Sequence, residues 1–264
     1  MKKLAIISQT KSGTTALYYK ILHSLTNQNV IGVFEPEQLS IPTDKEYDYL
    51  LVKALIHNNT TLDLNSIFRF DKLIYIVRDP RDWLISRILF EMRGVQIAPK
   101  PQAVEQVIEL LRQKETKPKS ISMYDLMSIL AKYTMHNTDN MIAWIRNQQL
   151  WLAGFEQQLQ IHDHILFYYE DMIDNRLNKL EQYLGFSLLA GESQVEKDHQ
   201  HVIRSKSYGN WKDWFVESDI NYFKPLFSHY IKQHAYPDDW TLNNNPRIDP
   251  KLCSEYVINN MGKY

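Results

Sequence analysis

A short polar stretch near the start of the chain combines residue types that can bind an oxyanion. Lys11, Ser12, Gly13, Thr14 and Thr15 stand between an apolar run and a segment whose apolar residues recur at helical spacing. The N–H groups of a helix's first turn lack partners within the helix, and the helix dipole adds positive charge there. Gly13 lets an anion approach the backbone closely, while Lys11 and the hydroxyl groups add a cation and donors. The pattern predicts an anion-binding loop between a strand and a helix.

The order of these residues differs from that of the common nucleotide-binding loop. That loop ends in Gly-Lys-Ser or Gly-Lys-Thr and uses the hydroxyl for magnesium, whereas Lys11 precedes Gly13 here. The five residues alone also fit an ordinary polar turn before a helix. Their assignment therefore depends on companions elsewhere in the chain.

A second candidate for anion binding is the pair Arg78 and Ser86, which follows the apolar run at 72–77. Asp79 suits a helix N-cap and Pro80 the first helical position, so a helix start explains both residues. It does not require Arg78, whose guanidinium can hold a phosphate through two hydrogen bonds. Ser86 lies about two turns into the expected helix, on a face that can return toward the arginine.

Four segments together resemble the PAPS-dependent sulfotransferases, where PAPS is 3′-phosphoadenosine 5′-phosphosulfate. Lys11 to Thr15 resembles the family's 5′-phosphosulfate loop, and the stretch from Arg78 to Ser86 resembles its 3′-phosphate motif. Tyr169 opens a Tyr-Glu-Asp-Met segment whose tyrosine approaches the adenine in that family. The stretch 204–212 resembles the late motif that closes over the 3′-phosphate.

The resemblance implies PAPS as cosubstrate, 3′,5′-ADP (PAP) as product and no required metal. It assigns Lys11 to the leaving oxygen as a catalytic cation. The residues that it implies for holding PAPS are Lys11, Ser12, Gly13, Thr14, Thr15, Arg78, Ser86, Tyr169, Arg204, Lys206 and Gly209. This chain departs from the family pattern at Ser205, which replaces a lysine, and at Ala16, which replaces an adenine-stacking tryptophan. Lys206 stands where the late motif has its first glycine.

The general base that accepts the acceptor's proton has two candidates. Many members carry it in a Lys-Thr-His segment, and the matching residues here are Lys53, Ala54 and Leu55. Leucine cannot take a proton, but alternate residues of a strand share a face, so His57 points the same way one step further out. Glu35 lies in a Phe-Glu-Pro segment that resembles the catalytic glutamate segment of other members. We rank Glu35 first, His57 second and Lys53 as a supporting cation.

The composition limits the remaining possibilities. The chain has 264 residues, a formal net charge of −1 and one cysteine, Cys253. The net charge gives no reason to expect nucleic-acid binding, and one cysteine excludes an internal disulfide. The first apolar run is too short for a signal peptide, and no stretch is long enough to span a membrane. We therefore expect a cytoplasmic protein, and the oligomeric state is not readable from the sequence.

Apolar runs separated by helical patterns must position these residues. The runs at 30–34, 49–56, 72–77 and 165–169, with the first one ending at Ile7, predict buried parallel strands, and parallel sheets are covered by helices on both faces. Ligands of such sheets bind beyond the carboxyl ends of the strands. We expect an α/β, three-layer, P-loop-like fold with a central parallel sheet flanked by helices. The chain would form one domain, 1–264, with a helical insertion at 94–160.

The sequence does not identify the acceptor. We expect a hydroxyl or amine on a small molecule or a carbohydrate, in a pocket shaped by the insertion and the tail. Two other functions stay open: a PAPS-binding or PAP-binding protein without catalysis, suggested by Leu55, and a P-loop-type kinase. A kinase would require magnesium and ATP, and the binder would show no turnover.

Overall fold

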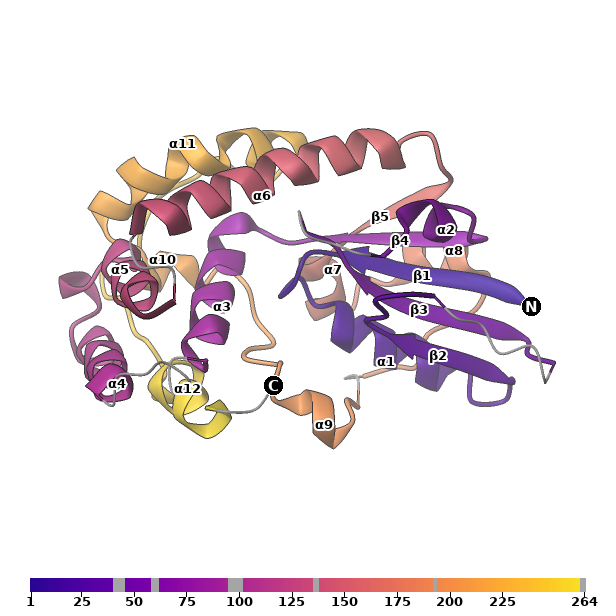
Figure 1. Cartoon of the computed structure of the whole chain (residues 1–264), viewed down its shortest axis with the longest axis horizontal. Helices are drawn as coiled ribbons and strands as arrows, with labels where there is room; N and C mark the ends of the chain where they lie inside the picture. The colour runs from indigo at the N-terminus through magenta and orange to yellow at the C-terminus, as the bar shows by residue number, and fades with distance from the viewer. Residues whose placement is uncertain (40–45, 58–61, 95–101, 135–137, 192–193, 262–264) are drawn as a thin grey trace. The chain divides into compact units, whose positions relative to one another are not determined.

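The computed structural model divides into two compact units (Figure 1). Unit 1 comprises residues 1–78 and 150–200, and unit 2 comprises residues 79–149 and 201–264. The structure describes the whole chain except residues 40–45, 58–61, 95–101, 135–137, 192–193 and 262–264. The helical segment expected at 94–160 belongs mainly to unit 2, together with the C-terminal part of the chain.

Unit 1 is built on a five-stranded sheet of order β2-β3-β1-β4-β5 in which all neighbouring strands are parallel. The strands are β1 (Lys2–Ser8), β2 (Val30–Phe34), β3 (Tyr49–Leu55), β4 (Lys72–Val77) and β5 (His164–Tyr168). Each lies within about two residues of a predicted apolar run. Because β1 lies between β3 and β4, the chain leaves its carboxyl end at the point where strand order reverses, which is where such sheets bind ligands.

Helices cover both faces of this sheet. The helices of unit 1 are α1 (Thr14–Ser24), α2 (Leu64–Phe68), α7 (Tyr169–Ile173), α8 (Asn178–Leu184), α9 (Lys197–Gln200) and the C-terminal part of α6 (Thr138–Leu159). A Cβ at Gly32 would overlap the Tyr18 hydroxyl, so the face that carries Gly32 meets α1. Tyr75 lies on the opposite face, where its hydroxyl donates to Glu156 of α6 at 2.6 Å. The predicted α/β, three-layer fold is confirmed.

Helices are the regular secondary structure of unit 2 among its described residues, and loops such as 201–210 and 235–249 connect them. Its helices are α3 (Pro80–Met92), α4 (Gln102–Thr116), η2 (Pro118–Ser120), α5 (Met123–Thr134), the N-terminal part of α6, α10 (Trp211–Trp214), α11 (Glu217–Gln233), η3 (Pro250–Leu252) and α12 (Ser254–Asn260). Its apolar core joins Leu89 of α3, Leu111 of α4, Leu130 of α5 and Val257 of α12.

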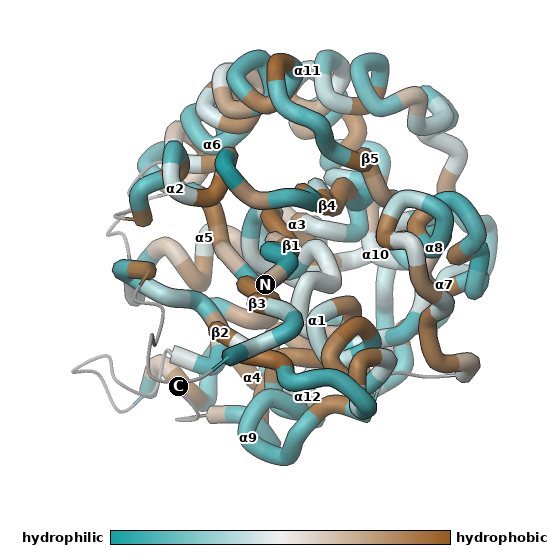
Figure 2. Tube along the Cα trace, turned by 90° about the vertical axis from the view of Figure 1, so that its right-hand side faces the viewer, coloured by the Kyte–Doolittle hydropathy of each residue, from teal (hydrophilic) through white to brown (hydrophobic). Residues whose placement is uncertain are grey.

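The C-terminal part of the chain is more helical than its sequence indicates. The residues after 222 carry no sharp sequence signal, yet α11 continues to Gln233 with Pro225 inside it. Its buried residues include Phe223, Phe227 and Ile231, spaced four apart, and hydrophobic and hydrophilic turns alternate along this helix (Figure 2). The segment after β5 forms two short helices, α7 and α8. Gly185 ends α8 in the left-handed region, where glycine is favoured.

Candidate functional site

The loop between β1 and α1 has a backbone suited to binding an anion. Lys11 has φ 71° and Gly13 has φ 92°, while Ser12 between them is not in the positive-φ region. Alternation of this kind turns successive N–H groups toward one side and forms an anion-binding concavity. Thr14 and Thr15 follow in the first turn of α1 and are buried. The predicted strand–loop–helix context is therefore present.

The side chain of Tyr169, the first residue of α7, packs against this loop. A Cβ at Gly13 would lie 2.6 Å from Cδ2 of Tyr169 and 3.0 Å from Cε of Met172, so the loop backbone lies directly on these side chains. The Tyr169 ring is buried and lies 4.2 Å from the Arg78 guanidinium carbon. Its predicted contact with adenine stays a prediction, and the structure adds a packing role.

Arg78 connects the end of β4 to the loop. Its Nη1 donates to the Lys11 carbonyl oxygen at 2.8 Å, and the residue is only 3% exposed. Nε and Nη2 of Arg78, and Oγ of Ser12, are buried and have no hydrogen-bond partner among the described residues. Buried polar groups usually have partners, so these donors suit an anionic ligand. The sequence pointed to Arg78 and Ser12 but not to the bond between Arg78 and Lys11.

Glu35 and Lys53 form an ion pair at the same end of the sheet. Nζ of Lys53 contacts Oε1 of Glu35, and their side chains are 2% and 39% exposed. The Glu35 N–H donates to the Lys53 carbonyl oxygen at 2.8 Å, and Glu35 adopts φ 50°, a region that non-glycine residues rarely occupy. Burial lowers the pKa of Lys53, and the charge of Glu35 partly offsets this. Two of the predicted catalytic residues are therefore in contact.

His57 lies just beyond β3 and is exposed. Lys53 is buried, Leu55 is half-buried and His57 is exposed, which follows the predicted outward progression along one face of the strand. Asn58 and Asn59, which follow His57 in the sequence, lie outside the described residues. The choice between Glu35 and His57 as base stays a prediction.

In unit 2, the first turn of α3 holds the late motif through Asp82. Asp79 is the N-cap and accepts from the Arg81 N–H, with Pro80 at the first position, as predicted. Asp82 is fully buried, and its carboxylate accepts from the N–H groups of Gly209 at 2.5 Å and Trp211 at 3.0 Å. The two motifs, distant in sequence, are joined by this carboxylate.

Arg81 is a structural centre that the sequence did not reveal. Its guanidinium makes three hydrogen bonds to the Asp79 carboxylate and lies 4.1 Å from the Trp211 ring and 5.0 Å from the Trp240 ring. It also donates to the carbonyl oxygens of Pro237 and Asp239. The spacing of Asp79 and Arg81 is a signal for their pairing, but the tryptophans come from distant segments.

The other predicted residues of unit 2 differ in exposure. Ser86 is buried on α3. Arg204 is buried, donates to the Leu252 carbonyl oxygen at 3.1 Å and lies 5.9 Å from the Trp214 ring, whereas Lys206 is exposed. Gly209 has φ 76°, with open space where a Cβ would stand. Glycine is therefore favoured there by backbone conformation rather than by lack of space.

The predicted site residues fall into both units. The structure brings together Lys11, Ser12, Gly13, Arg78 and Tyr169 in unit 1. Ser86, Arg204, Lys206 and Gly209 belong to unit 2, and the boundary falls directly after Arg78. Convergence of the two sets on one ligand stays a prediction.

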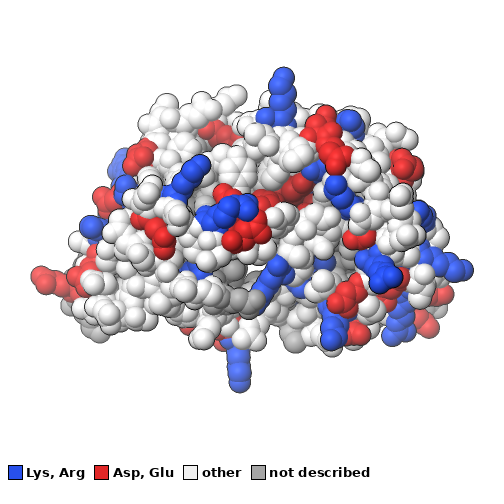
Figure 3. All heavy atoms as spheres, turned by 180° about the vertical axis from the view of Figure 1, so that it is seen from behind, with Lys and Arg blue, Asp and Glu red and all other residues white. Residues whose placement is uncertain are grey.

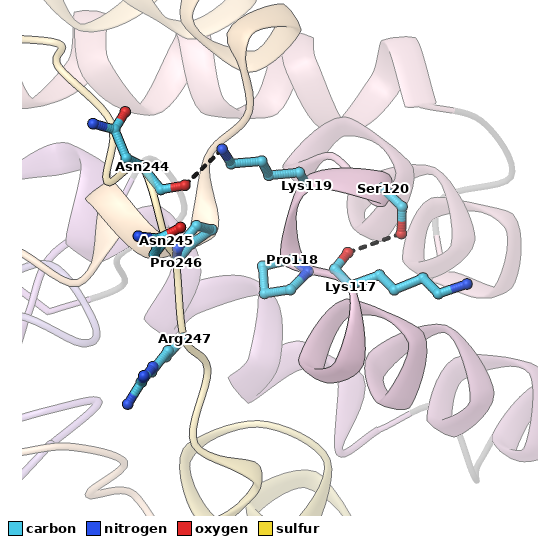
Figure 4. Close-up of a pocket in the computed structure, with 8 residues that line it drawn as sticks. All are labelled: Lys117, Pro118, Lys119, Ser120, Asn244, Asn245, Pro246 and Arg247. Atoms are coloured by element: carbon cyan, nitrogen blue, oxygen red, sulfur yellow. Dashed lines mark hydrogen bonds between the residues drawn. The ribbon is translucent and has the colours of Figure 1, made fainter.

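Other surface features lie apart from the predicted residues. A cavity of about 620 Å³ lies in unit 2 between residues 117–120 and 244–247, and none of the predicted site residues lines it (Figure 4). Basic and acidic side chains are intermixed on the face shown in Figure 3. Among the described residues there is no group of three or more His, Cys, Asp or Glu residues that could hold a metal ion. In the same part of the chain, every helix is too short or too polar to cross a membrane.

Comparisons with known proteins give the family and the fold of this chain. The family model described as the sulfotransferase domain matches residues 1–219. Mouse sulfotransferase SULT7A1 complexed with PAP has a TM-score of 0.54 at 14% identity, over 89% of this chain and 88% of that one. Retinol dehydratase in complex with androsterone and inactive cofactor PAP has a TM-score of 0.49 at 12% identity, over 93% of this chain and 84% of that one. No curated protein matches the sequence. The likeness to the mouse structure shows the fold.

Proposed function

Because this chain belongs to the sulfotransferase family, we propose that it transfers a sulfuryl group from PAPS to a hydroxyl or amine of a small-molecule or carbohydrate acceptor. PAPS supplies an activated sulfuryl group and leaves as 3′,5′-ADP. The remaining work belongs to the chain, which must bind the anion, orient the reactants and accept a proton. The family assignment favours this function over a kinase.

The buried donors around the loop carry the proposal. Arg78 is fixed by the Lys11 carbonyl oxygen and by the Tyr169 ring, and its Nε and Nη2 have no partner among the described residues. A buried cation with unused donors costs stability unless a ligand completes its hydrogen bonds. A phosphate or sulfate oxygen fits both Arg78 and the Ser12 hydroxyl.

Lys11 is the cation proposed to stabilise the oxygen that departs. The N–H groups of Gly13, Thr14 and Thr15 reinforce it, because the loop conformation and the start of α1 direct positive charge to the same side. Stabilisation of developing charge by fixed donors is commonly the largest catalytic contribution in group transfer. Ser86, Arg204, Lys206 and Gly209 are proposed to hold the 3′-phosphate.

Glu35 is the proposed general base, supported by Lys53. Contact with the buried Lys53 ammonium holds the Glu35 carboxylate at the carboxyl end of the sheet. Glu35 remains 39% exposed, so an acceptor can reach it. The positive φ of Glu35 is a local strain of the kind found at functional sites. His57 is the alternative base.

We also propose a cytoplasmic location, which suits a chain with a single cysteine.

Two measurements test the function. Saturating 3′,5′-ADP at ~100 times its dissociation constant should stabilise the folded chain by about 2.7 kcal/mol, measured by thermal shift. Radiolabelled PAPS with a panel of phenols, alcohols, amines and sugars should give labelled product without added magnesium. Stabilisation without turnover supports the binding protein instead, and turnover only with ATP and magnesium supports a kinase. Absence of any shift with 3′,5′-ADP refutes PAPS binding.

The Glu35→Gln variant tests the base once an acceptor is found. General-base catalysis contributes about 10²–10⁴-fold, so kcat should fall by that range while the affinity for 3′,5′-ADP stays unchanged. Glu37→Gln is the matched control, because Glu37 is an exposed carboxylate two residues further on. Turnover close to wild type in Glu35→Gln, with a large loss in His57→Gln, assigns the base to His57.

A further inference from the structure

The ring of Phe34, the last residue of β2, is held on several sides. Nζ of Lys53 lies 3.9 Å from its centroid, and the His199 imidazole is stacked on it with centroids 3.9 Å apart and planes 13° apart. Tyr18 meets it edge-on at 5.3 Å. If the Lys53 ammonium and the His199 ring lay on the same face of the Phe34 ring, they would overlap, because each is 3.9 Å from the Phe34 centroid. Phe34 therefore separates His199 from Lys53.

His199 is itself fixed from α1. The Tyr19 hydroxyl lies 2.5 Å from Nδ1 of His199 and 3.3 Å from Oε2 of Glu196. Tyr19 is buried, and burial together with Glu196 raises its pKa to about 12, so the phenol keeps its proton. A neutral imidazole can therefore accept the Tyr19 hydroxyl hydrogen at Nδ1. These contacts join the short helix α9 to the end of the strand that precedes Glu35.

We propose that His199 is a positioning residue for the Lys53–Glu35 pair. Its imidazole fixes the Phe34 ring, the opposite face of that ring holds the Lys53 ammonium, and the ammonium holds the Glu35 carboxylate. This inference rests on the proposed function, in which Glu35 acts as base.

Protonation of His199 changes this arrangement in a defined way. Nδ1 then becomes a donor, so Tyr19 accepts from it and turns its own hydrogen toward Glu196. A second cation then lies across the ring from Lys53, where it competes for the electron density that attracts the ammonium. Other charged or titratable groups of the described residues near this cluster include His23 beside Tyr19, Lys197 and Asp198 of α9, and Glu35 in contact with Lys53.

The coupling can be measured without sulfuryl transfer. In protein labelled with ¹³C at lysine Cε, the Lys53 signal, assigned through Lys53→Met, should shift with pH together with the His199 ring signals. His199→Phe keeps a stacked ring but cannot titrate, so it should remove this inflection. His229→Ala, which removes an exposed histidine of unit 2, should leave it unchanged. An inflection that persists in His199→Phe overturns the proposal.

Catalysis supplies the second readout. Loss of the stack in His199→Ala should lower kcat about 10-fold or more, because small misplacements of catalytic groups are costly, with the 3′,5′-ADP dissociation constant within twofold of wild type. Tyr19→Phe keeps the packing and loses the hydrogen bond, so it tests the same link if His199→Ala folds poorly. Unchanged kcat in both variants overturns the proposal. A wild-type chain that shows the lysine inflection but binds no 3′,5′-ADP would refute the proposed function and leave the positioning contact supported.

Discussion

Replacing Gly13 with alanine tests how the loop between β1 and α1 is held in place. At this position φ is 92°, and a Cβ would lie 2.6 Å from Cδ2 and 3.0 Å from Cε2 of Tyr169. The Tyr169 ring also carries the Arg78 guanidinium at 4.2 Å. The substitution therefore strains the backbone and pushes on the ring that positions Arg78.

The expected cost has two parts. A non-glycine residue in the left-handed region costs about 1–2 kcal/mol, and an extra methyl group in a packed site costs about 1–3 kcal/mol. Gly13→Ala should therefore lower the free energy of unfolding by about 2–5 kcal/mol. It should also weaken 3′,5′-ADP binding, because Arg78 moves with Tyr169.

Gly185→Ala separates the two contributions. Gly185 has φ 80° but nothing within 4 Å of the position of its Cβ, so alanine there incurs only the backbone cost. Urea unfolding of the wild type and both variants, with calorimetric titration of 3′,5′-ADP, measures stability and affinity together. Gly13→Ala should be about 1–3 kcal/mol less stable than Gly185→Ala, and only Gly13→Ala should lose affinity.

A double substitution isolates the contact with Tyr169. In the Tyr169→Ala background the ring is absent, so adding Gly13→Ala should lower the free energy of unfolding only by the cost of the backbone strain. The double-mutant cycle of Gly13→Ala and Tyr169→Ala should therefore show a coupling energy of about 1–3 kcal/mol. Equal losses for Gly13→Ala and Gly185→Ala, or a coupling energy near zero, would refute the packing of the Gly13 backbone on the Tyr169 ring.

Two further outcomes concern unit 2. Asp82→Ala leaves the N–H groups of Gly209 and Trp211 without their carboxylate partner. The free energy of unfolding should therefore fall by about 2–4 kcal/mol, and both amide hydrogens should exchange faster with solvent. Unchanged hydrogen-exchange protection of these two amides would contradict the assigned contacts. Burial lowers the pKa of Lys114 to about 8, so between pH 8 and 10.5 the unfolded chain binds a proton that the folded chain does not, and stability should rise with pH. Between pH 7 and pH 10, the free energy of unfolding measured with urea should rise by about 2 kcal/mol more in the wild type than in Lys114→Met. An equal pH dependence of stability in the two proteins would contradict this role of Lys114.

The strands and most helices are predictable because their signals are local. Apolar runs of five to eight residues predict β2, β3 and β4 closely, and Asp79 with Pro80 predicts the start of α3. By contrast, α11 contains Pro225 and polar residues that weaken its local pattern. It is stabilised by burial of Phe223 and Phe227 in the core of unit 2, and such burial depends on segments far away in sequence.

The sequence predicted those residues of the candidate site whose chemistry depends on residue type and on the order of neighbouring residues. Lys11 before Gly13, Arg78 after a strand and Glu35 beside a proline all carry local signals. No local sequence signal pointed to the contacts of His199 and Arg81, or to the packing of Tyr169 against the loop. Their roles depend on which rings and carbonyl groups the fold brings near them.

The parallel sheet, the loop between β1 and α1 and the family resemblance follow from local sequence patterns, because strand periodicity and motif order are properties of neighbouring residues. The contacts of Lys53 with Glu35, of Arg78 with the Lys11 carbonyl oxygen and of Asp82 with the Gly209 N–H could be found only in the folded chain. These contacts join residues from 18 to 127 positions apart. Hydrogen bonds and ion pairs act over a few ångströms, so they exist only once folding has brought their partners together.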